Sequence, residues 1–227
     1  MTVPGSVADG VAAVQARVAD AARRSGRDPN EVRVVAATKT RSIEAISAVV
    51  EAGIHDLGEN RAQELVAKGP ALASLDPVWH FIGRLQRNKI NQLAPWVGWW
   101  HSIDRLDLGD ALARRVPGAR VLVEVNVGAE PQKGGAAPSA TPALVEHLRE
   151  LGLDVVGLMT VAPVTGDPAR MFEALQAMAA RLELSELSMG MSNDFEAAIA
   201  QGATMVRLGT ALFGARPTFP GSGPPGR

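Results

Sequence analysis

The chain has 227 residues, the size of one (β/α)-barrel, and its 23 basic and 24 acidic side chains give a formal charge of −1. So small a net charge provides no overall field to attract nucleic acid or an anionic membrane. Cysteine and tyrosine are both absent, which excludes disulfides, thiolate nucleophiles and any catalytic scheme that needs a phenol.

No apolar run approaches the roughly 18 residues that span a bilayer. The first ten residues, MTVPGSVADG, lack the charged and apolar regions of a signal peptide. We therefore expect a soluble, cytoplasmic protein.

The first predicted element is an amphipathic helix over residues 7–24, in which Val7, Val11, Val14 and Val18 recur at steps of four and three. Residues 32–38, VRVVAAT, are mostly β-branched and small. Such a run is typical of a strand that is buried on both faces of a parallel sheet.

Helical and apolar segments alternate after this strand. The predicted helices span residues 42–52, 62–68, 86–93, 105–116, 142–151, 169–182 and 195–201. The predicted strands span residues 54–57, 78–82, 99–103, 120–127, 153–159, 186–189 and 204–208. Eight strands at a spacing of roughly 25 residues, with helices between them, predict an α/β fold, a single (β/α)8 TIM-type barrel.

Only a short segment follows the last strand, so the N-terminal helix is expected to close the ring of outer helices and to bring the two termini together. The barrel is expected to occupy residues 1–215 as one domain. The Pro/Gly-rich stretch 216–227 is expected to be a disordered tail. Residues 128–141 form a long loop of the kind that often serves as an active-site flap.

In such a barrel the functional site forms at the C-terminal ends of the strands. Lys39 directly follows VVAAT of the first strand. Desolvation at that position would favour the neutral amine that a Schiff base requires. The alternative is an exposed lysine that begins a loop.

Strands seven and eight end in small and hydroxyl-bearing residues, in SMGMSN at 188–193 and RLGT at 207–210. Loops after these two strands commonly form a phosphate site, because backbone N–H groups of small residues can approach an anion closely. Ordinary turn glycines are the alternative. Asn193 is the expected N-cap of the following helix, with Glu196 completing a capping box.

Arg207 lies between Val206 and Leu208 in a strand that should be buried, where an unpaired guanidinium would be costly. Its partner is either a carboxylate on a neighbouring strand or an atom of a ligand. A lysine amine, a phosphate cradle and a buried arginine at one end of a barrel together describe a pocket for pyridoxal 5′-phosphate (PLP).

The sequence resembles the pyridoxal phosphate homeostasis proteins, single-domain relatives of the alanine racemase barrel, over nearly its whole length. The blocks that carry the resemblance are ATKT with Lys39, GEN and QE within 58–64, WHFIG and LQRNK within 79–89, HSID at 101, VEVN, E and KGG within 123–135, GLMT at 157, SMGMS at 188 and VRLGTALFG at 206–214.

The resemblance implies that Lys39 holds PLP as a Schiff base and that Arg207 faces the pyridine nitrogen. The other residues it implies are Ser192, Gly209 and Thr210 for the phosphate, and Gly190 and Asn60 near the cofactor. The sequence departs from the family at Ala62, where valine is more frequent, and Arg84 occupies a variable position. Both positions affect the mouth of the pocket more than the attachment of the cofactor.

The function implied is PLP homeostasis in the cell, by buffering or delivery, with little or no catalysis. One alternative is a PLP-dependent amino acid racemase of low activity, and another is a Schiff-base phosphosugar aldolase without PLP. An arginine at the pyridine nitrogen weakens the electron sink that carbanion chemistry needs. The related racemases also use a tyrosine opposite the lysine and a second domain, and this chain has neither.

The expected partners are PLP and PLP-requiring apoenzymes, with no nucleic acid and no membrane, and the chain is expected to be a monomer or a weak homodimer. No metal site is expected, because no two of the four histidines have HxH or HxxxH spacing.

Overall fold

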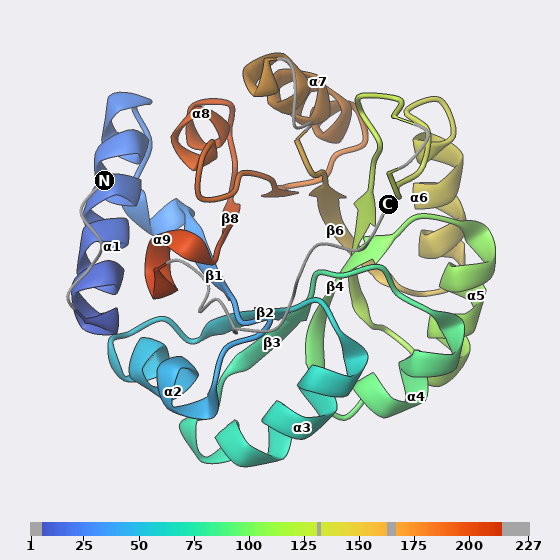
Figure 1. Cartoon of the computed structure of the whole chain (residues 1–227). Coiled ribbons are helices and arrows are strands. Elements are labelled where there is room, and N and C mark those ends of the chain that lie inside the picture. The colour runs from blue at the N-terminus through green and yellow to red at the C-terminus, as the bar shows by residue number, and fades with distance from the viewer. Residues whose placement is uncertain (1–5, 131–132, 163–166, 215–227) are drawn as a thin grey trace, which may run out of the picture.

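Eight parallel strands close into a barrel within the described part of the computed structural model, which covers residues 6–130, 133–162 and 167–214 (Figure 1). The strands follow one another around the barrel in chain order, and β1 pairs with β8 from Arg33 opposite Met205 to Ala36 opposite Leu208. The strands are β1 Arg33–Ala37, β2 Asp56–Glu59, β3 Val78–Phe81, β4 Val97–Ile103, β5 Arg120–Glu124, β6 Asp154–Met159, β7 Glu186–Ser188 and β8 Met205–Leu208. The predicted (β/α)8 barrel is confirmed.

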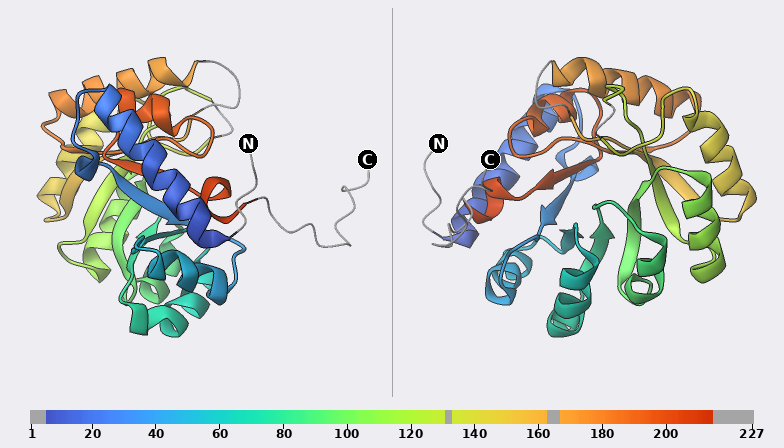
Figure 2. Two further views of the ribbon diagram at one scale, coloured as in Figure 1. Left: turned by 90° about the vertical axis from the view of Figure 1, so that its left-hand side faces the viewer. Right: turned by 45° about the vertical axis from the view of Figure 1, so that its right-hand side comes forward.

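Helices surround the strands (Figure 2). They are α1 Val7–Arg24, α2 Ile43–Glu51, α3 Ala62–Leu72, α4 Ile90–Leu93, α5 Leu106–Arg115, α6 Thr141–Glu150, α7 Pro168–Arg181, α8 Phe195–Ala200 and α9 Thr210–Phe213. Short 3-10 turns add η1 Pro29–Glu31, η2 Ala73–Leu75 and η3 Arg87–Lys89. No helix of the described residues has both the length and the apolarity to cross a membrane.

Helix α1 closes the ring as predicted. Its buried face includes Val11, Val14 and Val18, and it packs against α2 on one side and against α8 and α9 on the other (Figure 1). An ion pair between Arg17 of α1 and Glu196 of α8 adds to this contact. The N-terminal helix therefore lies beside the last helix of the described chain, which brings the two ends of the barrel sequence together.

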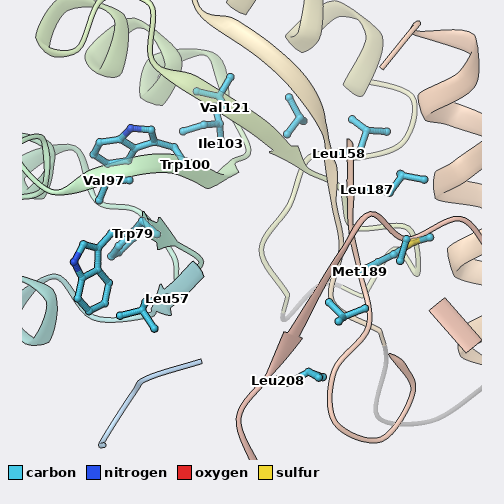
Figure 3. Packing of buried hydrophobic residues seen from close by; sticks show 14 of the residues in the cluster. Leu57, Trp79, Val97, Trp100, Ile103, Val121, Leu158, Leu187, Met189 and Leu208 are labelled. Carbon is cyan, nitrogen blue, oxygen red and sulfur yellow. The ribbon is translucent and has the colours of Figure 1, made fainter. Parts of the chain in front are cut away.

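The hydrophobic core has two layers because successive side chains of a strand point to opposite faces. The larger layer fills the space between the strands and the helices, and Figure 3 shows several of its members, among them Leu57, Trp79 and Trp100. The smaller layer lies inside the barrel and consists of Val35, Trp99, Leu122, Met159 and Met205. The barrel interior is thus a packed core.

Several predicted bounds are wrong; the strand expected over 120–127, for example, ends at Glu124. Strand β2 begins at Asp56 rather than residue 54, because Ile54 belongs to the connection after α2, where its N–H donates to Val49 O. Helix α8 is preceded by Asp194 rather than Asn193, and Asp194 Oδ1 accepts a hydrogen bond from Met191 N at 2.5 Å.

Two other expectations concern segments that the structure does not fully describe. The expected tail, 216–227, lies outside the described residues, and the loop 128–141 is described except for 131 and 132.

Candidate functional site

The expected site residues converge at the C-terminal rim of the barrel, which is formed by the residues that directly follow the strands. A Cβ added to Gly209, after β8, would lie 3.5 Å from Ala37 O at the end of β1, two residues before Lys39. Arg207 N donates to Gly190 O at 2.9 Å, which joins β8 to the end of β7. The barrel thus brings together segments that are up to about 170 residues apart in the chain.

Ser192 and Thr210 lie on the two neighbouring loops of this rim. Ser192 Oγ accepts a hydrogen bond from Ala211 N at 3.2 Å, so the loop after β7 is tied to the start of α9. Thr210 is exposed and Gly209 is half-buried. Gly190 has φ +93, and an added Cβ would lie 2.6 Å from Ala198 Cβ, so only glycine fits this turn.

Lys39 lies in the turn after β1 and is exposed. The expectation that its amine is desolvated is therefore wrong: β1 ends at Ala37, and the chain has already left the apolar interior two residues later. The position of Lys39 at the rim, rather than burial, connects it with the other candidate residues.

A buried cluster of charged side chains holds the residue before Lys39. Lys68 Nζ of α3 donates to Thr38 O at 2.8 Å, to Glu59 Oε2 at 2.7 Å and to Glu64 Oε2 at 2.6 Å. Thr38 Oγ1 donates to Glu59 Oε2 at 2.8 Å. Because Glu59 is fully buried and Lys68 nearly so, this cluster fixes the end of β1 firmly.

Thr40, the residue after Lys39, is held by the same cluster. Its N–H donates to Glu64 Oε2 at 2.8 Å, and its backbone has φ +62, which is strained for a β-branched residue. Burial would raise the pKa of Glu64, but hydrogen bonds from Lys68 and Thr40 outweigh it and leave that pKa lowered. Both neighbours of Lys39 are thus fixed while the lysine side chain itself is exposed.

Arg207 is 5% exposed and makes its hydrogen bonds to uncharged oxygens. Its Nη1 donates to Ser188 O and to Ser188 Oγ, both at 2.7 Å, and its Nη2 donates to Thr160 O at 2.7 Å. Within the described residues it has no ion pair, so the expected alternative of a carboxylate partner on a neighbouring strand is wrong. Burial lowers the pKa of Arg207 to about 10, and the charges of Glu124 and Asp194 oppose that fall.

Glu124, which ends β5, is a residue of this rim that the sequence analysis did not select as a candidate. Burial, together with the nearby charge of Asp104, raises its pKa to about 7, against the opposing effects of Arg207 and Arg84. The alternation of β5 could have identified it, since Leu122 points into the barrel and Glu124 follows two residues later.

A pocket of about 180 Å³ lies next to Glu124, lined also by Asn126, Lys133 and Gly134. A Cβ on Gly134 would lie 3.7 Å from Glu124 Oε1 and 3.9 Å from Asp104 Oδ2. The described part of the 128–141 loop therefore lies against these two carboxyl groups.

Asn60 follows β2 at the same rim. Its N–H donates to Glu59 Oε1 at 2.8 Å, whereas its side-chain Oδ1 is buried without a hydrogen-bond partner. A buried acceptor without a partner is costly, and a ligand that donates a hydrogen bond would remove this cost.

The structure also joins two histidines that the sequence separates by 21 residues. His80 Nδ1 of β3 lies 2.8 Å from His101 Nε2 of β4, and both rings are fully buried. Among the described residues, no group of three or more histidine, aspartate or glutamate side chains is arranged to hold a metal ion.

Comparisons with known proteins identify relatives of this chain. Residues 11–217 match the family model of the N-terminal domain of alanine racemase. The chain is 42% identical over 221 residues to a pyridoxal phosphate homeostasis protein of Pseudomonas aeruginosa, across 93% of this chain and 96% of that protein. The chain belongs to the pyridoxal phosphate homeostasis protein family.

Other members of this family have the same extent and the same fold. A homeostasis protein of Aquifex aeolicus is 42% identical over 214 residues, which cover 88% of this chain and 94% of that protein. The solved structure of PipY of Synechococcus elongatus with PLP bound is 34% identical, has a TM-score of 0.78 and covers 88% of this chain and 100% of that chain. The resemblance stated from the sequence blocks is thus confirmed.

Proposed function

We propose that this chain holds PLP as a Schiff base on Lys39 and acts in PLP homeostasis in the cytoplasm, by buffering the cofactor or delivering it to PLP-requiring apoenzymes. The observation that carries the proposal is the convergence of Lys39, the loops after β7 and β8, and buried Arg207 at one rim of the barrel. Membership of a family named for PLP homeostasis supports it.

The residues at the rim fit the chemical groups of PLP. Lys39 offers an exposed amine for the aldehyde. Ser192, Gly209 and Thr210 offer hydroxyl and backbone donors for the phosphate, and Arg207 is the residue assigned to the pyridine nitrogen. The orphaned Oδ1 of Asn60 is an acceptor for a donor group of the ligand. When bound, PLP supplies an electron sink to an attached amine.

Little or no catalysis is expected from this site. Arg207 next to the pyridine nitrogen would keep that nitrogen largely unprotonated, which weakens the electron sink. The full sequence also contains no tyrosine to move a proton on the face opposite Lys39.

Glu124 favours slow racemisation as a second candidate function. Its pKa of about 7 suits a general acid or base, and its charge acts on Arg207. A racemase assay on the wild type and on Glu124→Gln tests this candidate. Turnover of about 1 per second or more would contradict a role restricted to homeostasis, and its loss in Glu124→Gln would assign the proton transfer to that residue.

Borohydride reduction followed by peptide mass spectrometry tests the attachment. The chain has four lysines, Lys39, Lys68, Lys89 and Lys133, and we expect the pyridoxyl adduct on Lys39 alone. Lys39→Ala should lose both the adduct and the absorbance of the bound cofactor. The matched control Lys89→Ala, on η3, should retain both. An adduct on another lysine, or none, would overturn the proposal.

Delivery is tested by mixing the PLP-loaded protein with an apoenzyme that requires PLP, while a third protein traps free PLP. Recovery of the apoenzyme's activity despite the trap supports direct transfer. Recovery only without the trap would restrict the function to buffering.

A further inference from the structure

A continuous line of hydrogen-bonded side chains crosses the inside of the barrel. Asp56 Oδ1, at the start of β2, lies 2.8 Å from His80 Nε2, and His80 Nδ1 lies 2.8 Å from His101 Nε2. His101 Nδ1 lies 2.9 Å from Ser188 Oγ, which accepts from Arg207 Nη1 at 2.7 Å. The line therefore runs from the N-terminal end of β2 to the arginine of the candidate site, and we call it the Asp56–Arg207 line.

The hydrogen bonds of this line can point in one direction only. Asp56, as a carboxylate, accepts, so His80 carries its proton on Nε2 and its Nδ1 accepts. His101 must then donate from Nε2, which leaves its Nδ1 to accept from the hydroxyl of Ser188. Ser188 Oγ is in turn free to accept from Arg207, which can only donate.

The reverse direction would require a charged imidazole in the core. If His101 donated from Nδ1, His80 would have to donate from Nδ1 as well as from Nε2 and would be a cation. Both rings are fully buried, and a cation there loses its hydration. Burial, against the opposing effect of Asp56, lowers the pKa of His80, and burial lowers the pKa of His101 well below its ordinary value.

We propose that Asp56 is a positioning residue for Arg207, which it orients across the barrel through fixed tautomers of His80 and His101. Its negative charge sets the direction of every hydrogen bond in the line, so that the Ser188 hydroxyl donates to His101 and its oxygen, which this donation makes a stronger acceptor, accepts from the guanidinium. Chains of hydrogen bonds polarise one another, so each bond strengthens the next. The effect of Asp56 on the cofactor rests on the proposed function, whereas its effect on the tautomers of His80 and His101 does not depend on that function.

The outer end of the line is braced and reaches solvent. Trp99 stacks on His80, with ring centroids 5.5 Å apart, and the guanidinium groups of Arg33 and Arg120 lie 4.8 and 4.7 Å from the Trp99 ring. Asp56 is 23% exposed and borders a pocket of about 370 Å³. The carboxylate thus keeps partial hydration, which lowers the cost of holding it as an anion.

Nitrogen NMR of the unliganded wild type with labelled histidine tests the direction of the line. At neutral pH we expect His80 and His101 each in a single Nε2–H tautomer. We also expect a scalar coupling between His80 Nδ1 and His101 Nε2 across a hydrogen bond whose proton is bound to His101. His147, whose Nε2 lies 2.8 Å from Asp110 Oδ1, provides a reference outside the line. A proton on His101 Nδ1, or a charged ring in either residue, would overturn the proposal without any variant.

Two aspartates at the same end of the barrel provide a matched pair of variants. In Asp56→Ala, His101 should populate both neutral tautomers. Solvent exchange of the Arg207 Nη1 protons should become about fivefold to tenfold faster, the factor that corresponds to the free energy of one net hydrogen bond. Asp154→Ala removes only the exposed ion pair with Arg120 and should change neither. Unchanged tautomers and exchange in Asp56→Ala would contradict the proposal, and Asp56→Asn serves if the alanine variant does not fold.

A third arm follows the cofactor. With PLP that is labelled at the pyridine nitrogen, Asp56→Ala should shift the signal of that nitrogen and Asp154→Ala should not. Failure to bind PLP would overturn the proposed function alone, since the tautomers and the exchange rates are measured without it. Binding with an unchanged nitrogen signal in Asp56→Ala would overturn the link from Asp56 to the cofactor.

Discussion

Glu124 and Arg207 both lie at the C-terminal rim, and burial acts on their charges in opposite directions. It raises the pKa of Glu124 to about 7 and lowers that of Arg207 to about 10, while their mutual attraction opposes both changes. Because Glu124 changes its charge near neutral pH, it changes the field at Arg207 over the same range.

Glu124→Gln should alter how stability depends on pH. Between about pH 4.5, where the unfolded carboxyl ionises, and pH 7, where the native one does, unfolding releases a proton. The wild type therefore loses up to about 3 kcal/mol of unfolding free energy across this range that the glutamine variant keeps.

Urea titrations at pH 5 and pH 8 measure this difference. Glu146→Gln, at an exposed position on α6, is the control and should follow the wild type. An equal pH dependence in the wild type and in Glu124→Gln would contradict the prediction.

Lys68→Met should destabilise the protein by roughly 3–5 kcal/mol, because it leaves the buried charge of Glu59 without its partner. Arg61→Met is the control: Arg61 also pairs with Glu64, but it is 66% exposed, so its loss should cost at most about 0.5 kcal/mol. Chemical denaturation compares the two variants. Equal losses of unfolding free energy would contradict the prediction that the buried cluster next to Lys39 contributes more to stability than an exposed ion pair.

At the scale of elements, the hydrophobic periodicity located the helices and strands well and their ends less well. The steps of three and four in α1 correspond to its buried face, because that face alone meets α2, α8 and α9. The shift of β2 arose because Ile54 is buried in a connection, and burial by itself does not distinguish a strand from a turn. Helix α9 was not predicted, since four residues carry too little periodicity.

The contact between β6 and β7 depends on a glycine. A Cβ on Gly157 would lie 2.0 Å from Glu186 O, so Gly157→Ala must push the strands apart and should cost roughly 3 kcal/mol or more. In Gly98→Ala, within β4, the atom nearest to the added Cβ would be Val78 Cγ1 at 3.7 Å. The free energy of unfolding should therefore stay the same or rise by about 0.5 kcal/mol. Thermal melting tests both variants, and similar melting temperatures would contradict the prediction.

At the scale of the whole molecule, the surface of the described residues exposes few large apolar side chains that could support self-association. The large apolar side chains of the described residues that are at least a third exposed are scattered over different elements: Val66, Val78, Leu106, Leu151, Val161 and Met191. A stable dimer buries roughly 800 Å² on each partner around an apolar centre.

We therefore predict that sedimentation velocity will give a mass near 23.8 kDa, with at most weak dimerisation as concentration rises. A dimer that persists on dilution would contradict this prediction.

The sequence by itself determined the barrel, the closing helix and the set of residues at the ends of the strands. These features depend on local patterns, since helix and strand periodicity and the residues that follow each apolar run can be read within one segment. Lys39, Arg207 and the loops that we propose to hold the phosphate were selected in this way.

Only the tertiary structure decided which side chains meet. Strand register around the closed barrel, which no single segment encodes, places His80 on His101 and Ser188 on Arg207. It also exposes Lys39 and partly buries Glu124, because exposure and pKa depend on neighbours that come from distant parts of the chain.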